Sequence, residues 1–191
     1  MESLTPGAWR EALKLYRWVC TFVAVARREH DDWWLDVGAI MRRETRDPRG
    51  WESLDPYEDE EERREDPLFP WLETPSTPAD AERYRPMTSE VPRSSVPSLL
   101  VMFTVSPLSD PSRLPDWEKY GPERERRAKT LLSRFPDGTR FFSNLGCWEG
   151  DRPDFLKQSS LGSNPFSGFD WDAGLIAVNN DEVAVIWNFF N

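Results

Sequence analysis

His30 is the only histidine in the sequence, and it sets a low limit on the acid–base chemistry that the chain can perform. A serine or cysteine nucleophile that is activated by an imidazole would have to use it. The His30-Asp31-Asp32 run, however, is typical of a helix boundary, because aspartate is a preferred N-cap residue. Cys147 is a second candidate nucleophile, but no neighbouring cation would lower its pKa. We therefore predict no catalytic residue.

Two pairs of carboxylates stand beside tryptophans, an arrangement that is typical of sites where two acids flank a glycosidic bond. Glu149 and Asp151 adjoin Trp148, and Asp170 and Asp172 flank Trp171. Five of the ten tryptophans have an acidic neighbour, whereas composition alone would give about three. This excess is small, so a carboxylate-using enzyme or a sugar-binding protein is kept only as an alternative.

The sequence contains no motif for a metal or a cofactor, and we predict neither. Two cysteines and one histidine do not make a zinc site, and no glycine-rich phosphate loop is found. The run from 179 to 182 lacks EF-hand spacing and is typical of a hairpin turn, although an all-carboxylate calcium or magnesium site is compatible with the composition. A disulfide between Cys20 and Cys147 is also compatible with the sequence.

The charge and the tryptophans favour binding to another protein. A net charge of −10 disfavours nucleic acid and attracts cationic partners. Residues 55–66 hold eight carboxylates and two arginines, a local net charge of −6, whereas the predicted helix at 122–135 carries five cations and two acids. Three interpretations stay open: the acidic run is a solvated surface, it lies near that helix, or it steers a basic partner.

Tryptophan is enriched at binding hot spots, so we expect the tryptophans in irregular segments to join these acids in a partner-binding surface. The candidate residues are Trp51, Asp55, Glu58, Asp59, Glu60, Glu61, Glu62, Trp71, Trp148, Glu149 and Trp171. Trp9, Trp18 and Trp187 lie in regular apolar patterns and are predicted to be core residues.

We predict a single domain in which residues 1–44 are helical. Thr5 and Pro6 are typical of a helix start. Two apolar stripes at helical spacing then continue to Val23 and Ala26, which predicts one long helix that is buried on more than one side. A second helix is expected from about Trp33 to Glu44.

Residues 45–97 form a proline-rich acidic connection, and we expect them to be irregular. Nine prolines interrupt this segment, so a regular helix or strand fits only around 57–64. Its aromatic residues predict that the connection wraps around its own domain, with docking on a partner as the second interpretation.

Residues 98–191 are predicted to contain a small antiparallel sheet of three to four strands with one intervening helix. The apolar run 98–105 predicts a buried strand, Pro122 a helix start, and 139–145 a short strand. A C-terminal hairpin is expected from strands at 174–178 and 183–190. The fold class is therefore α+β.

The function that these patterns favour is that of a non-catalytic acidic module that binds a protein with a basic surface. An inhibitor of the immunity-protein or antitoxin type is the most concrete form of this hypothesis. A structural subunit of a larger phage or viral assembly is the main alternative. The sequence lacks a signal peptide and a long apolar segment, which predicts a cytoplasmic protein without membrane contact, and it leaves the oligomeric state open.

Overall fold

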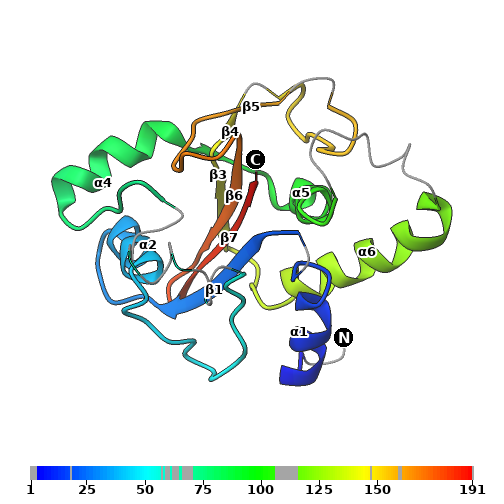
Figure 1. The fold of residues 1–191 in the computed structure, drawn as a ribbon, viewed down its shortest axis with the longest axis horizontal. Coiled ribbons are helices and arrows are strands. Elements are labelled where there is room, and N and C mark those ends of the chain that lie inside the picture. Colours follow the sequence, from blue (N-terminus) through cyan, green and yellow to red (C-terminus); the bar gives the residue numbers. More distant parts are fainter. Residues whose placement is uncertain are drawn as a thin grey trace.

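A five-stranded antiparallel sheet with helices on both faces forms the centre of the fold, which is α+β as predicted (Figure 1). The computed structural model describes residues 4–190 except 18, 57, 59–60, 62–64, 66–70, 106–115, 147 and 159–160. The strand order is β1-β7-β6-β3-β2, so the sheet is wider than the three to four strands that we expected.

The helices lie in two groups and the strands in two sheets. The helices are α1 Pro6–Leu13, α2 Trp33–Met41, α4 Pro78–Tyr84, η1 Arg85–Met87, η2 Arg93–Ser95, α5 Val96–Met102 and α6 Trp117–Leu132. The strands of the main sheet are β1 Thr21–Arg27, β2 Ser89–Glu90, β3 Arg140–Ser143, β6 Trp171–Val178 and β7 Glu182–Phe190. A second, two-stranded sheet pairs β4 Leu145–Gly146 with β5 Gly162–Ser163.

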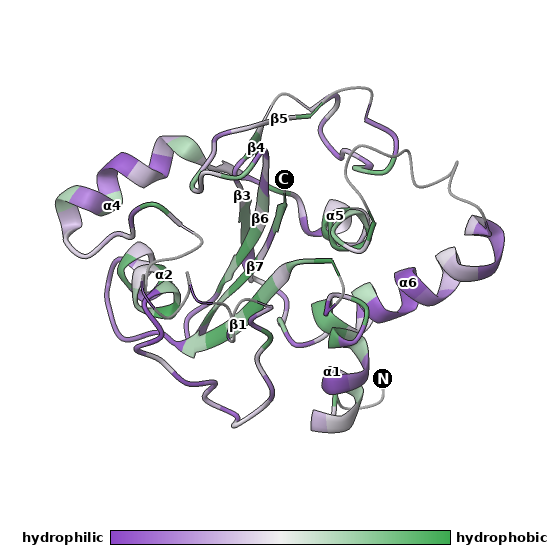
Figure 2. Cartoon of the chain, viewed as in Figure 1, coloured by the Kyte–Doolittle hydropathy of each residue, from purple (hydrophilic) through white to green (hydrophobic). Residues whose placement is uncertain are grey.

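Alternate residues of the strands pack against opposite layers of helices. In β7, Ala184 and Ile186 face the cluster that contains α1, α5 and α6, whereas Val185 and Trp187 face the cluster that contains α2 and α4. We call these two sides the α1 face and the α2 face. Figure 2 shows that β1, β6, β7 and α5 are mostly hydrophobic, whereas α4 and α6 carry many hydrophilic residues.

The predicted C-terminal hairpin is confirmed as β6 and β7, with Val178 paired to Val183 next to the turn. Asn179 holds the turn, because its side-chain Oδ1 accepts hydrogen bonds from the backbone N–H groups of Asp181 and Glu182. Gly174 is required in β6, since a Cβ there would lie 1.9 Å from the ring of Trp187. A tryptophan thus lies flat on the strand beside it.

The prediction of one long N-terminal helix is wrong. Thr5 caps α1 as expected, but the helix ends at Leu13, and Thr21–Arg27 forms the edge strand β1. The apolar residues of this segment pair with β7, for example Val23 with Ile186. The long-range ladder has overridden a local pattern that is compatible with both structures.

The predicted buried strand at 98–105 is also wrong, because Val96–Met102 forms helix α5. Pro97 stands at its first turn, where the fixed φ of proline favours a helix and no N–H is needed. A short continuous apolar run does not distinguish a buried helix from a buried strand. Here the apolar side chains of α5 are buried in one cluster with those of α6.

The proline-rich connection is more regular than expected. Thr77 and Asp80 form a reciprocal capping box at the start of α4, and Pro78 occupies the first turn of this helix. Two 3-10 turns and β2 follow before residue 97. The segment 57–64, where we expected the only regular element, lies mostly outside the described residues.

Helix α6 begins at Trp117 rather than at Pro122, which lies inside it. Pro122 lacks the N–H that would bond one turn back, yet the helix continues to Leu132. In the part of the chain that the structure describes, no helix has the length and apolar character needed to cross a bilayer.

Candidate functional site

Trp71 is not an exposed anchor, because its side chain is buried in the aromatic cluster of the α2 face. Its ring meets that of Trp187 edge-on at 4.8 Å, and the ring of Phe166 lies at the same distance. Trp9 and Trp187 are core residues as predicted, whereas Trp18 lies outside the described residues. Trp71 packs on Trp187 of the sheet and forms a bridge with Ser167, as expected for a connection that wraps around its own domain.

Trp51 belongs to a buried charged cluster on the α1 face. The guanidinium of Arg134 lies 5.0 Å from the Trp51 ring and 4.9 Å from the Trp9 ring, and the Arg134 side chain is fully buried. Arg134 donates hydrogen bonds to the carboxylates of Asp47 and Glu182. We call this group the arginine cluster. Trp51 is therefore half-buried by intramolecular packing, which reduces its value as an anchor for a partner.

Trp171 and Trp148 are also half-buried. Trp171 donates its indole N–H to Asn188 at 2.9 Å, and Trp148 meets Phe155 edge-on. Trp171 pairs with Phe190, at the opposite end of the hairpin from Glu182 and the arginine cluster. Eight strand residues separate these ends, which is roughly 26 Å. The predicted tryptophans thus do not gather on one surface.

Among the predicted acidic residues, Asp55 and Glu58 line one cavity, while Glu61 and Glu149 are exposed. Asp59, Glu60 and Glu62 lie outside the described residues. One open interpretation placed this run near the cations of α6, but Arg126 and Arg127 both donate to Glu123 of their own helix. The connection does reach the end of α6, but through the Asp47–Arg134 ion pair.

The cavity at Asp55 and Glu58 lies along the outer edge of β1 and has a volume of about 280 Å³. We call it the acidic cavity, since three carboxylates and one guanidinium line it: Asp47, Asp55, Glu58 and Arg43. Arg43 follows α2 in the left-handed region, with a φ of 61°, and donates to Asp55 at 2.8 Å. The apolar part of the wall comes from α2 and β1.

Backbone groups of β1 also face this cavity. The N–H and C=O of Val23 bond to Leu54 on the outer side of the strand, while Arg28 and Cys20 bond on the side of β7. Because outward and inward groups alternate along a strand, the N–H and C=O of Val25 point outward. Within the described residues neither group has a hydrogen-bond partner, although Val25 is only 2% exposed. Buried peptide groups are almost always paired, so the unpaired groups of Val25 are an unusual feature of this edge.

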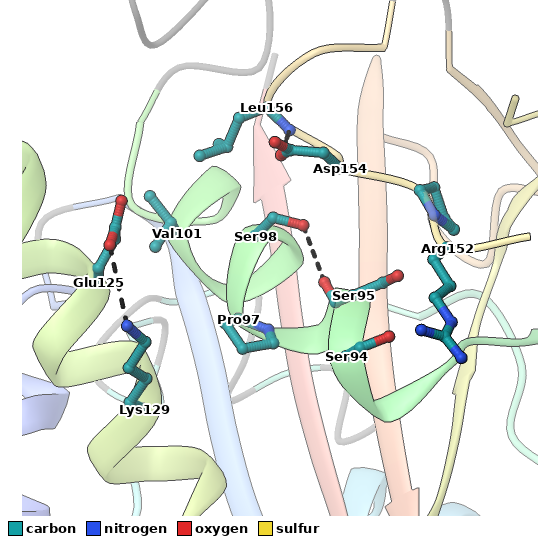
Figure 3. Close-up of a pocket in the computed structure, with 11 residues that line it drawn as sticks. Ser94, Ser95, Pro97, Ser98, Val101, Glu125, Lys129, Arg152, Asp154 and Leu156 are labelled. Atoms are coloured by element: carbon teal, nitrogen blue, oxygen red, sulfur yellow. Dashed lines mark hydrogen bonds and ion pairs between the residues drawn. The ribbon is translucent and has the colours of Figure 1, made fainter. Parts of the chain in front are cut away.

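A second cavity, of about 330 Å³, lies between α5, α6 and the segment after β4 (Figure 3). Ser94, Ser95 and Ser98 contribute hydroxyl groups to its lining, and we call it the serine cavity. Arg152 and Lys129 also line it, together with Glu125 and Asp154. Glu125 lies 3.9 Å from Lys129, and Asp154 pairs with Lys157 at 2.9 Å.

The carboxylates that flank Trp171 cannot act together on a substrate. Asp172 is 1% exposed and accepts hydrogen bonds from the backbone N–H groups of Phe166 and Ser167 and from the indole of Trp187. Burial raises the pKa of Asp172, and these hydrogen bonds oppose that effect. Asp172 therefore holds the loop before β6 onto the sheet.

His30 has a structural contact in the described structure. Its Nδ1 lies 2.6 Å from Asp36, which also accepts hydrogen bonds from Arg28 and from the backbone N–H of Glu29. Asp32 caps α2, which confirms the predicted helix boundary. No group of three or more His, Cys, Asp or Glu side chains within the described residues is arranged to hold a metal ion.

Sequence reasoning named Asp55 and Glu58 of the acidic cavity, but it missed Val25 and the residues of the serine cavity. Val25 was assigned to a helix, and the role of its peptide groups depends on the alternation of a strand that pairs with β7. Ser95 and Arg152 meet only through the tertiary fold. The adjacent serines before Pro97 are the only local sign of the serine cavity.

Comparisons with known proteins add no relative. The sequence matches no protein-family model, and no curated protein or solved structure gives a significant match.

Proposed function

We propose that this protein binds a partner protein with a basic surface by pairing an extended, basic segment of the partner with the open edge of β1. Such binding would let it act as a non-catalytic inhibitor of the immunity-protein or antitoxin type. The proposal includes a cytoplasmic location. The observation that carries it is the unpaired N–H and C=O of Val25 at a cavity that is rich in carboxylates.

Strand addition supplies the main-chain part of the recognition. A peptide that lies antiparallel or parallel to β1 would satisfy the Val25 groups, which have no partner within the described part of the chain. Leu54 already pairs with Val23, so the available edge begins beyond that bridge. A cavity of about 280 Å³ is large enough for one or two side chains of such a segment, and not for a folded element.

The charge of the lining selects a cationic side chain. Asp47 and Asp55 are held by Arg134 and Arg43, whereas Glu58 is exposed and has no ion pair within the described residues. A lysine or arginine that enters the cavity would meet Glu58 first. The acidic run at 55–66 adjoins this position in the sequence and would steer a basic partner towards it.

A peptide with known backbone chemistry tests the proposal. The probe is an acetylated octapeptide of alternating arginine and threonine, with binding measured by calorimetry at two salt concentrations. Two analogues carry N-methyl groups on alternate backbone amides. One analogue is methylated at the odd-numbered amides and the other at the even-numbered amides. We expect one analogue to lose binding and the other to retain it, because only one set of N–H groups faces β1.

Side-chain variants test the charge. Glu58→Gln should weaken binding of the octapeptide about tenfold, whereas Glu149→Gln, an exposed acid outside the acidic cavity, should have no effect. Equal affinity of the two N-methylated analogues would refute strand addition. Equal affinity of Glu58→Gln and Glu149→Gln for the octapeptide would refute recognition at the acidic cavity.

A further inference from the structure

We infer that the serine cavity is a binding site for a small ligand that carries one oxyanion group, a carboxylate or a phosphate monoester, on an apolar body. This site is separate from the acidic cavity and does not depend on the function proposed above. It rests on the unpaired polar groups of Ser95 and Arg152 and on the apolar wall opposite them.

The first observation is a buried hydroxyl group without a partner. Ser95 is 2% exposed, and its Oγ makes no hydrogen bond in the described structure. A buried unpaired hydroxyl is costly, and a native structure usually has a reason for keeping one. Ser98 differs, since it donates to the carbonyl of Ser95 at 2.8 Å and accepts from the N–H of Phe155 at 3.1 Å.

The second observation is a guanidinium without a counter-charge. Arg152 is an exposed residue that lines the same cavity and makes no ion pair within the described residues. In Figure 3 the hydroxyl groups of Ser94 and Ser95 point to the side on which Arg152 lies, and the Glu125–Lys129 pair lies on the other side. Arg152 therefore provides the positive end of the site, with hydroxyl donors beside it.

The carboxylates in the lining do not cancel this charge. Asp154 is held by Lys157 and also accepts from the N–H of Leu156 at 3.1 Å. Glu125 is the helical neighbour of Lys129. A planar guanidinium binds carboxylate or phosphate oxygens in pairs, and serine hydroxyls add single hydrogen bonds to the same group.

The rest of the lining indicates the body of the ligand. Pro97, Val101 and Leu156 form an apolar wall, and the cavity volume of about 330 Å³ suits a ligand of one ring. The Oγ of Ser95 is itself covered by neighbouring atoms, so a change of rotamer must accompany binding. The ligand would then replace the missing partner of Ser95.

Phenyl phosphate and benzoate are suitable probes, because they share the ring and differ in the oxyanion. Benzyl alcohol is the neutral control. Binding to the full chain is measured by calorimetry, and the anion that binds more tightly identifies the oxyanion class. We expect at least one anion to bind and benzyl alcohol to bind at least about tenfold more weakly.

Three variants assign the binding to this cavity. Arg152→Gln and Ser95→Ala should each weaken anion binding about tenfold, while Arg46→Gln, an exposed arginine in another segment, should leave it unchanged. Ser95→Ala should unfold at the same or higher denaturant concentration, because it removes an unsatisfied hydroxyl. The inference is overturned if neither anion binds below about 10 mM, or if all three variants bind alike.

Discussion

On the α1 face of the sheet, Trp9 donates its indole N–H to the carbonyl of Glu52 at 2.8 Å. On the α2 face, the indole N–H groups of Trp34 and Trp71 are buried and have no hydrogen-bond partner in the described structure. Trp9 thus connects two segments through its polar group, whereas Trp34 and Trp71 fill space beside Trp187, which donates its own indole N–H to Asp172.

The charged groups differ in the same manner. The α1 face buries the arginine cluster, in which Arg134 pairs with Asp47 and Glu182, and the more exposed Arg49 also pairs with Glu182. On the α2 face, Asp172 has no ion pair within the described residues and accepts from N–H donors, whereas Asp36 of helix α2 pairs with Arg28. We conclude that the α1 face depends on a buried arginine shared by two carboxylates, whereas the part of the α2 face around Trp187 depends on ring packing and on the acceptor Asp172.

The largest effect is expected from Arg134→Met. This change leaves Asp47 buried without its cation and leaves Glu182 with Arg49 alone, and removing one partner of a buried ion pair costs about 3–5 kcal/mol. Urea unfolding gives the loss in the free energy of unfolding. The control is Arg140→Met, which breaks an exposed pair with Glu90 and should cost at most about 1 kcal/mol. Similar losses in both variants would show that the α1 face does not depend on charge balance.

Asp172→Asn tests the α2 face and should cost about 2 kcal/mol. An amide offers an NH₂ group where Asp172 accepts from N–H donors, so at least one buried donor loses its partner. Asp170→Asn, at an exposed neighbouring position, should change the free energy of unfolding by less than about 0.5 kcal/mol.

The same carboxylate gives a pH signature. Because burial raises the pKa of Asp172 above its ordinary value of 3.8, the folded state keeps the proton in a pH range where the unfolded chain has lost it. This contribution to stability is full below 3.8 and is lost as pH rises through the folded pKa. The difference in stability between wild type and Asp172→Asn should therefore depend on pH in this range, and a constant difference would exclude a raised pKa.

A smaller effect should distinguish the tryptophans themselves. Replacing the indole by benzothiophene removes the N–H and keeps the ring shape. At Trp9 this leaves the Glu52 carbonyl without its donor and should cost about 1 kcal/mol. At Trp71 it should be neutral or stabilising, because the N–H has no partner within the described residues. Thermal unfolding of the two substituted proteins decides whether the faces differ as we describe.

The smallest effect on stability is expected at Glu123 on the surface of α6. Hydrogen bonds from Arg126 and Arg127 lower the pKa of Glu123 to about 2. Its stabilising contribution is present above the ordinary value of 4.5 and is lost as pH falls through the folded pKa. Carboxyl NMR titration should show a midpoint near 2 in wild type and a higher one in Arg126→Gln, with little change in unfolding.

The sequence predicted elements whose signals are local. The hairpin of β6 and β7 was predictable because Asn179 is typical of a turn between two apolar runs, and α2 because Asp32 is a good N-cap. The α+β class followed from the number and kinds of these elements. The capping box of Thr77 and Asp80 was equally local, but we judged the segment 45–97 by its prolines alone and did not predict it.

The remaining elements depend on distant parts of the chain. Thr21–Arg27 is a strand because β7 offers a ladder, and Val96–Met102 is a helix because α6 covers it. The same holds for the cavities. Asp55 could be singled out in the sequence by its charge, whereas Val25 and Ser95 stand out only because polar groups of theirs lack hydrogen-bond partners in the described structure. Such information is not present in the residue pattern.

The position of β7 between β1 and β6 has a consequence for how the chain is made. Val23 of β1 pairs with Ile186 of β7, so an apolar strand that is synthesised early must wait for one that leaves the ribosome much later. Contacts between residues so far apart in sequence slow folding. Until β7 emerges, β1 is an exposed edge to which chaperones or other nascent chains can attach. The first strand to be synthesised, β1, thus pairs with the last one, β7.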